Sequence, residues 1–172
     1  IDRLKALISE RKQDIAFLRI ETGTNLIGGQ PISMSNMLEV LNICRREGIR
    51  SVIDASLLQD NLYFIKTREP GYKDLPIRDI MHQLSAAADI IYFSSRKLGF
   101  SRGGAIITMH ENIYRELMEY VPLYEGFLTY GGMEVRSMEA MAQGLYETLD
   151  MEIISQGPIF IEALVKELVD YG

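Results

Sequence analysis

Apolar and polar positions along this chain follow two periods, one typical of strands and one typical of helices. Short, mostly apolar runs predict strands at residues 14–21, 50–54, 89–94 and 104–109. Apolar residues recur at helical spacing at Met34, Met37, Leu38, Leu41 and Cys44. Ser33 offers this helix an N-cap and Gly48 a stop. The same spacing predicts helices at 75–88, 111–120, 133–149 and 152–169.

Strands that alternate with helices indicate an α/β fold, a three-layer sandwich with a mostly parallel sheet and helices on both faces. The connection from the strand at 89–94 to the strand at 104–109 is too short for a parallel crossover, so we expect this pair to be antiparallel. Ligands of such sheets bind at the carboxyl ends of the strands. Asn25, Asp54, Ser94 and Lys97 all follow or end predicted strands, which makes them the candidate site.

Composition narrows the class of protein. The 172 residues carry a net charge of −6, which argues against a nucleic-acid-binding surface. The single cysteine, Cys44, excludes an internal disulfide and favours a reducing compartment, so we expect a cytoplasmic protein. Apolar runs are shorter than the roughly 20 residues of a membrane span. The chain begins at Ile1, and we therefore expect it to be a piece of a longer protein.

Two ionisable residues could carry chemistry. Asp54 ends an apolar strand, where a carboxylate needs a partner, although a helix cap or a structural salt bridge would also explain it. Lys97 would be a surface lysine if taken alone, but the neighbouring cation Arg96 favours the neutral, nucleophilic amine, and partial burial would act the same way. Ser94 and Ser95 could hydrogen-bond a phosphate. His82 and His110 lack metal-ligand spacing with each other or with Cys44, so no metal site is expected.

Several segments, in their order and separation, resemble the beta-eliminating lyases, the family of tyrosine phenol-lyase and tryptophanase. These segments are Thr24 to Met34 (TNLIGGQPISM), Asp54-Ala55-Ser56, Asp60 to Lys66 (DNLYFIK), Ser94-Ser95-Arg96-Lys97, Tyr124-Glu125-Gly126, Tyr130-Gly131-Gly132, and Met138 to Ala142 with Gly144-Leu145. The resemblance runs from about residue 14 to the end of the chain. It implies an aspartate-aminotransferase-like large domain, with the N-terminal flank and the small C-terminal domain outside these residues.

The resemblance also implies a cofactor, pyridoxal 5'-phosphate, and a role for each candidate residue. Lys97 resembles the lysine that binds the cofactor covalently and serves as the catalytic base. Asp54 resembles the aspartate that pairs with the cofactor's ring nitrogen, Asn25 the asparagine that contacts its phenolic oxygen, and Ser94 a serine that contacts its phosphate. The implied reaction is β-elimination on an amino acid, to pyruvate and ammonia, by a homo-oligomer whose subunits share active sites. A fragment of such a lyase is expected to be inactive alone.

Two positions depart from the family pattern. Leu57 stands where relatives carry an arginine, so a cation near the site is expected to be missing. The segment after Lys97, residues 98–102, is shorter than in relatives, where it borders a monovalent-cation site. Two other functions stay open at this point. One is a threonine-aldolase-type lyase that would use the same lysine and aspartate, and the other is a non-catalytic assembly domain.

Overall fold

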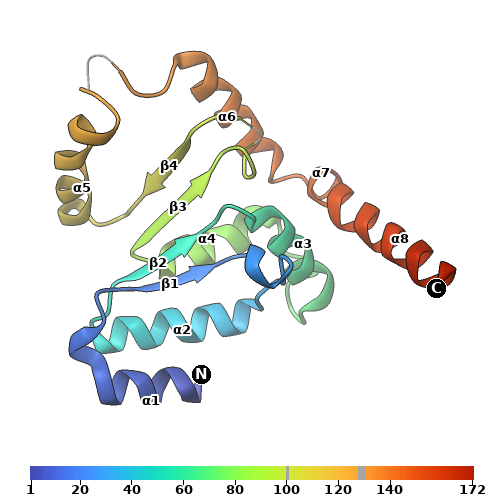
Figure 1. Ribbon diagram of the computed structural model, residues 1–172, viewed down its shortest axis with the longest axis horizontal. Coiled ribbons are helices and arrows are strands. Elements are labelled where there is room, and N and C mark those ends of the chain that lie inside the picture. The colour runs from blue at the N-terminus through green and yellow to red at the C-terminus, as the bar shows by residue number, and fades with distance from the viewer. Residues whose placement is uncertain (100, 128–130) are drawn as a thin grey trace.

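The fold is built on a four-stranded sheet. The computed structural model describes residues 1–99, 101–127 and 131–172. Strands β1 (Leu18–Glu21), β2 (Ser51–Asp54) and β3 (Ile90–Ser94) are parallel and adjacent in chain order, and β4 (Gly104–Ile107) pairs antiparallel with β3 (Figure 1). The expectation of an α/β domain with a mostly parallel sheet is confirmed, and so is the antiparallel fourth strand.

Helices connect and flank these strands. They are α1 (Asp2–Arg11), α2 (Met34–Glu47), α3 (Leu58–Arg68), α4 (Ile77–Ala87), α5 (Glu111–Tyr124), α6 (Val135–Glu147), α7 (Met151–Ile154) and α8 (Gln156–Tyr171). The short 3-10 turns are η1 (Lys12–Asp14) and η2 (Asn25–Ile27). Sequence periodicity did not predict α1 or α3. It also made the first strand too long, because η1 occupies its expected start, and it joined α7 to α8, which are separated at Ser155.

Local chemistry explains the bounds of α2. The Ser33 hydroxyl accepts a hydrogen bond from the amide of Asn36, as expected for an N-cap. At the other end Gly48 adopts φ +65°, a left-handed conformation that costs glycine little. Its amide bonds to the Arg45 carbonyl and the next amide, of Ile49, bonds to the Cys44 carbonyl, which is the Schellman arrangement. Both sequence signals for this helix are therefore confirmed.

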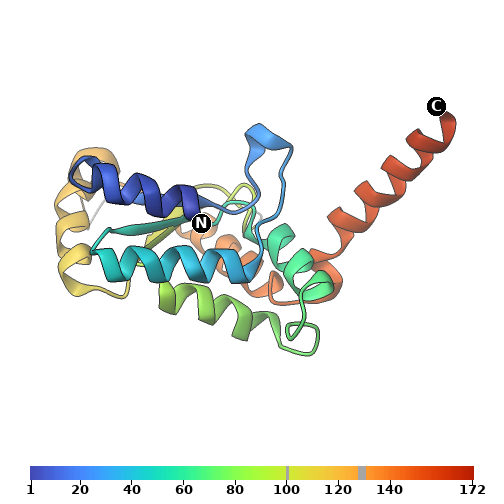
Figure 2. The same ribbon diagram turned by 90° about the horizontal axis from the view of Figure 1, so that it is seen from below.

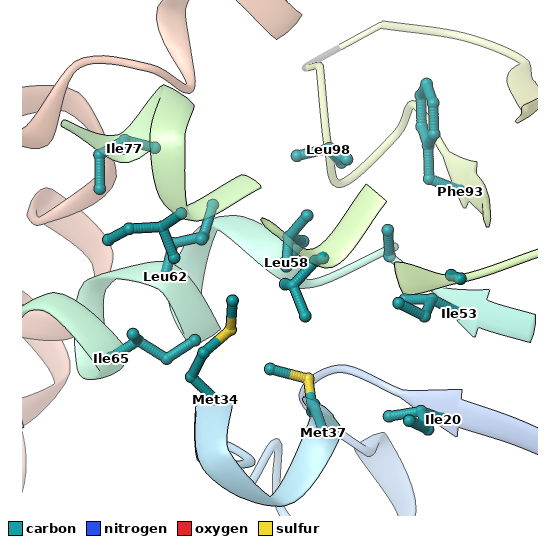
Figure 3. Close-up of a cluster of buried hydrophobic side chains, with 14 of the residues drawn as sticks. Ile20, Met34, Met37, Ile53, Leu58, Leu62, Ile65, Ile77, Phe93 and Leu98 are labelled. Carbon is teal, nitrogen blue, oxygen red and sulfur yellow. The ribbon is translucent and has the colours of Figure 1, made fainter. Parts of the chain in front are cut away.

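The main core lies between one face of the sheet and the helices α2, α3 and α4. Ile20, Ile53 and Phe93 of the strands share this core with apolar side chains of the helices (Figure 3). The helical contributors include Met34, Met37, Leu58, Leu62, Ile65 and Ile77. This packing fixes the strands from one side and thereby fixes where their carboxyl ends meet.

The opposite face of the sheet carries polar side chains. Strand pairing places Glu21, Asp54 and Tyr92 side by side on it, and the Arg19 and Ile106 side chains of the same face are exposed. At the far end of the chain, α8 projects away from the sheet in both views (Figures 1 and 2). Of the helices in the described ranges, none is both long and apolar enough to cross a membrane.

Candidate functional site

Hydrogen bonds join the carboxyl ends of the three parallel strands. The Asp54 carbonyl accepts bonds from the amide and the hydroxyl of Thr22, at 3.0 and 2.9 Å, which ties β2 to the end of β1. The Ser56 hydroxyl accepts a bond of 3.1 Å from the amide of Ser94, which ties the end of β2 to the end of β3. The edge that the sequence indicated is therefore a connected unit that contains both Asp54 and Ser94.

The Asp54 carboxylate is held by neutral donors. Its Oδ1 accepts the Ser56 amide at 3.1 Å and its Oδ2 accepts the Tyr92 hydroxyl at 2.8 Å. Partial burial opposes the charged form, but the hydrogen bonds from Ser56 and Tyr92 outweigh it and lower the pKa of Asp54 below its ordinary value. Asp54 is thus an anion that still has lone pairs free to accept a further donor.

Sequence reasoning missed two residues of this face, Tyr92 and Arg19. Arg19 Nη1 donates to the Tyr92 oxygen at 3.3 Å, and Arg19 Nη2 lies 3.4 Å from Glu21 Oε2. Burial first, and then the bond to Asp54, raises the pKa of Tyr92. Leu57 leaves the position of the family's arginine without a cation. Arg19 of the neighbouring strand supplies a different cation to this face. A charged residue inside the apolar run 14–21 was the available signal.

Lys97 lies in the turn that follows β3. The amides of Lys97 and Leu98 both bond to the Ser94 carbonyl, at 3.1 and 3.2 Å, which places the turn directly at the strand end. The Leu98 side chain is buried in the main core, whereas Lys97 and Arg96 are exposed. The partial burial expected for Lys97 was a prediction for the intact enzyme, and it stays a prediction. The turn is anchored by its neighbour Leu98, and the amine is free to reach a ligand.

The remaining candidates differ in their surroundings. Ser94 is half-buried and joined to Ser56, on the same face as Asp54. Ser95, also offered by the sequence as a phosphate contact, is instead buried, and its hydroxyl donates to the Arg102 carbonyl at 2.6 Å. Asn25 begins the exposed turn η2, three residues after Thr22. The structure therefore unites Asp54, Ser94 and the Lys97 turn, while Asn25 lies in a separate turn after β1.

Helix α6 supports the Lys97 turn from outside the sheet. A Cβ placed on Gly144 would overlap the carbonyl oxygen of Gly99, so the two backbones touch where both residues are glycine. Met141 and Leu145 of the same helix pack on the main core. Tyr130, part of one segment that carried the family resemblance, lies outside the described residues.

Two surface grooves run between α1 and α2, both lined by Lys5 and Arg46, and neither is lined by Asp54 or Lys97. Lys5 of α1 pairs with Glu39 of α2, and Lys12 of η1 pairs with Glu47 of α2, which is the ordinary arrangement of a solvated surface. These two grooves are therefore separate from the contacts at the strand ends.

Known proteins are similar to this chain over most of its length. The tyrosine phenol-lyase of Symbiobacterium sp. (strain SC-1) is 37% identical over 174 residues, covering 100% of this chain and 38% of that protein. A probable tryptophanase of Aeropyrum pernix is 36% identical over 155 residues, covering 90% of this chain and 33% of that protein. The chain thus spans well under half the length of these curated relatives.

Solved structures share the fold. One from Exiguobacterium sp. 255-15, assigned as an aromatic amino acid beta-eliminating lyase/threonine aldolase, superposes with a TM-score of 0.62 at 24% identity, covering 86% of this chain and 36% of that one. A methionine gamma lyase from Micromonospora echinospora gives a TM-score of 0.56 at 19% identity, covering 84% and 33%. The sequence profile of the family described as "Beta-eliminating lyase" matches residues 1–165. This chain therefore belongs to the beta-eliminating lyase family.

Proposed function

We propose that the full-length protein containing this chain is a pyridoxal-phosphate-dependent lyase that eliminates the β-substituent of an amino acid, yielding pyruvate and ammonia. The 172 residues would form part of its large, cofactor-binding domain. One observation carries the proposal: in a chain of the beta-eliminating lyase family, an ionised Asp54 is tied through Ser56 to Ser94, the residue on which the Lys97 turn is built. An anion and a primary amine are thereby brought to one edge of the sheet.

The residues at this edge fit the cofactor. Asp54 is an anion with acceptor capacity left, as a protonated ring nitrogen requires. Lys97 presents an exposed primary amine on an anchored turn, as covalent attachment requires. Ser94 and Asn25 supply hydroxyl and amide groups for the phosphate and the ring oxygen. When bound, pyridoxal phosphate supplies an electron-withdrawing ring that stabilises negative charge on the substrate's α-carbon.

The chain's own residues would then divide the work. The negative charge of Asp54 holds a proton on the ring nitrogen, which keeps the ring electron-withdrawing. Lys97 would hold the cofactor, and its Nζ would be the base that removes the proton from the substrate's Cα. Ser94 orients the phosphate, so that the reacting atoms stay in register with Lys97.

Membership of the family also supports a proposal for the substrate and the assembly. Relatives are named for tyrosine and tryptophan chemistry, so we propose an aromatic amino acid as the substrate class. The full-length protein would act as a homo-oligomer. The chain by itself would have no turnover, because it spans only 38% of the tyrosine phenol-lyase relative and a partial site leaves the substrate unclamped.

The attachment of the cofactor can be mapped directly. The full-length protein is incubated with pyridoxal phosphate and reduced with borohydride, and its peptides are analysed by mass spectrometry. We expect the label on Lys97 and its loss in Lys97→Ala. Lys73→Ala, which removes another exposed lysine, should label like the wild type. Label on a different lysine, or on none, would contradict the proposed site.

The reaction class needs a separate measurement. L-tyrosine, L-tryptophan and L-threonine are each incubated with the loaded protein, and pyruvate, ammonia and glycine are quantified. Pyruvate and ammonia in equal amounts from an aromatic substrate would support β-elimination. Glycine from threonine without pyruvate from any substrate would show an aldolase instead. Labelling of Lys97 without any product would favour the assembly role.

A further inference from the structure

Three side chains on the face of the sheet opposite the main core form a series of hydrogen bonds. The cofactor contacts proposed above give these bonds no role. Arg19 of β1 donates to the phenolic oxygen of Tyr92 of β3, at 3.3 Å, and Tyr92 donates to Asp54 Oδ2 of β2, at 2.8 Å. Arg19 and Asp54, the two ends of this series of hydrogen bonds, come from the neighbouring strands β1 and β2. Tyr92, between them in the series, comes from β3. Glu21 is the other charged group on this face, and it holds Arg19 Nη2 at 3.4 Å.

Donor and acceptor chemistry fixes the direction of these bonds. A guanidinium has only donors and stays protonated in proteins, so the Tyr92 oxygen must be the acceptor toward Arg19. A phenol has a single proton, which is then left for Asp54. The Asp54 oxygen that receives it must be an acceptor, which an ionised carboxylate always is. This direction of the bonds leaves Tyr92 neutral, and a charged Asp54, whose oxygens can only accept, fits it.

The two oxygens of Asp54 are fixed by different partners. Oδ2 receives the Tyr92 hydroxyl, and Oδ1 receives the Ser56 amide, which belongs to the backbone and cannot rotate away. With Tyr92 on one oxygen and Ser56 on the other, the plane of the carboxylate is set. Without Tyr92, the hydrogen bonds from Ser56, which involve its hydroxyl as well as its amide, would remain, but Asp54 would lose its bond to β3.

We propose that Tyr92, with its proton directed by Arg19, is the positioning residue that orients the Asp54 carboxylate and keeps it charged. Its use to the enzyme rests on the proposed pairing of Asp54 with the cofactor's ring nitrogen. In the enzyme, Tyr92 would preorganise the Asp54 carboxylate before the cofactor binds. Cofactor binding would then carry a smaller free-energy cost for ordering this side chain. Neither Tyr92 nor Arg19 would touch the substrate.

The first test measures Asp54 without any cofactor. The carboxyl carbon of Asp54 is followed by NMR through an acid titration in the full-length apoprotein. Removing the hydroxyl in Tyr92→Phe should raise the pKa of Asp54, because the anion loses a donor. Tyr114→Phe, which removes the hydroxyl of an exposed tyrosine on α5, should leave the titration as in the wild type. An unchanged titration in Tyr92→Phe would overturn the proposal.

The second test addresses the direction of the proton. Arg19→Lys keeps a group that can only donate, so it should preserve the wild-type titration of Asp54. Arg19→Gln introduces an amide oxygen that can accept the Tyr92 proton, so it should raise the pKa of Asp54 toward that of Tyr92→Phe. A Lys variant and a Gln variant that behave alike would overturn the role given to Arg19. A purely structural role would not separate these two variants.

The third test asks whether the hydrogen bond from Tyr92 to Asp54 affects cofactor binding. The dissociation constant of pyridoxal phosphate should rise by roughly tenfold in Tyr92→Phe, about 1.4 kcal/mol, and stay unchanged in Tyr114→Phe. A wild-type protein that binds no cofactor would reject the proposed function, while the acid titration would still decide the role of Tyr92. If Tyr92→Phe alters the titration of Asp54 but not the dissociation constant of pyridoxal phosphate, then the orientation of Asp54 by Tyr92 does not aid cofactor binding.

Discussion

Gly144 of α6 and Gly99 of the Lys97 turn lie backbone against backbone, so that a side chain on Gly144 would overlap the Gly99 carbonyl oxygen. Alanine in a helix interior is ordinarily favoured over glycine by about 1 kcal/mol. Here the overlap should reverse the sign and cost about 1–3 kcal/mol, as overpacking does. We therefore expect Gly144→Ala to lower the thermal unfolding midpoint of the full-length apoprotein.

Gly157 of α8 provides the matched control. The nearest atom to a Cβ at this position, Asp60 Oδ1, would be 3.9 Å away, which is ordinary contact. Gly157→Ala should accordingly keep or raise the unfolding midpoint. Equal effects of the two alanines would show that α6 does not press on the Lys97 turn.

Met37 tests the core beneath the sheet. Its side chain is 0% exposed and packs in the main core, so Met37→Ala should lower the free energy of unfolding by about 2–5 kcal/mol. Met109 is 81% exposed, and Met109→Ala should change it by no more than about 0.5 kcal/mol. Urea unfolding of the apoproteins measures both, and similar losses in the two variants would contradict the assignment of the core.

Asn61 secures the segment that leads into α2. Its buried side chain accepts from the Ile32 amide at 2.7 Å and donates to the Ile32 carbonyl at 2.9 Å. Asn61→Leu keeps the number and branching of the heavy atoms but leaves both backbone groups unpaired, at a cost of about 1–3 kcal/mol. Asn36→Leu, on the exposed face of α2, is the control and should be nearly neutral in the same urea titration.

The stability of the protein in acid should depend on the charge of the Asp54 carboxylate. Its folded-state pKa lies below the ordinary value of 3.8, so the charged carboxylate contributes stability that is fully present above that pH. The contribution is lost as the pH falls through the folded-state pKa. The difference in unfolding midpoint between wild type and Asp54→Asn should therefore be constant near neutral pH and shrink in strong acid. A difference that persists unchanged into strong acid would contradict the lowered pKa.

Much of the sheet could be predicted because its signals are local. The apolar runs, the Ser33 cap and the Gly48 stop each act over a few residues, and the short link after Ser94 leaves no room for a crossover helix. Helix α3 was missed for a physical reason. Its inward face includes the buried polar residues Gln59 and Asn61, which break the apolar period.

The contacts among side chains on the face of the sheet opposite the main core could not be predicted from local sequence patterns. The bond between Arg19 and Tyr92 joins residues 73 positions apart, and it exists only because β1, β2 and β3 pair in one register. A shift of one residue would turn Tyr92 to the core side. The sequence could name Asp54 and Lys97 through their places at strand ends and through family resemblance. It could not reveal what holds Asp54, or that Lys97 is exposed.

The exposure of Arg19 has a consequence for the electrolyte around the protein. Water and dissolved ions reach its guanidinium, and charges on such a surface are screened over about 10 Å at 0.1 M salt and about 3 Å at 1 M. The Tyr92–Asp54 bond is a short contact that screening barely touches. Concentrated salt should therefore weaken the electrostatic attraction between Arg19 and Asp54 but leave the hydrogen bond from Tyr92 intact. Varying the ionic strength would thus separate the long-range electrostatic effect from the hydrogen bond.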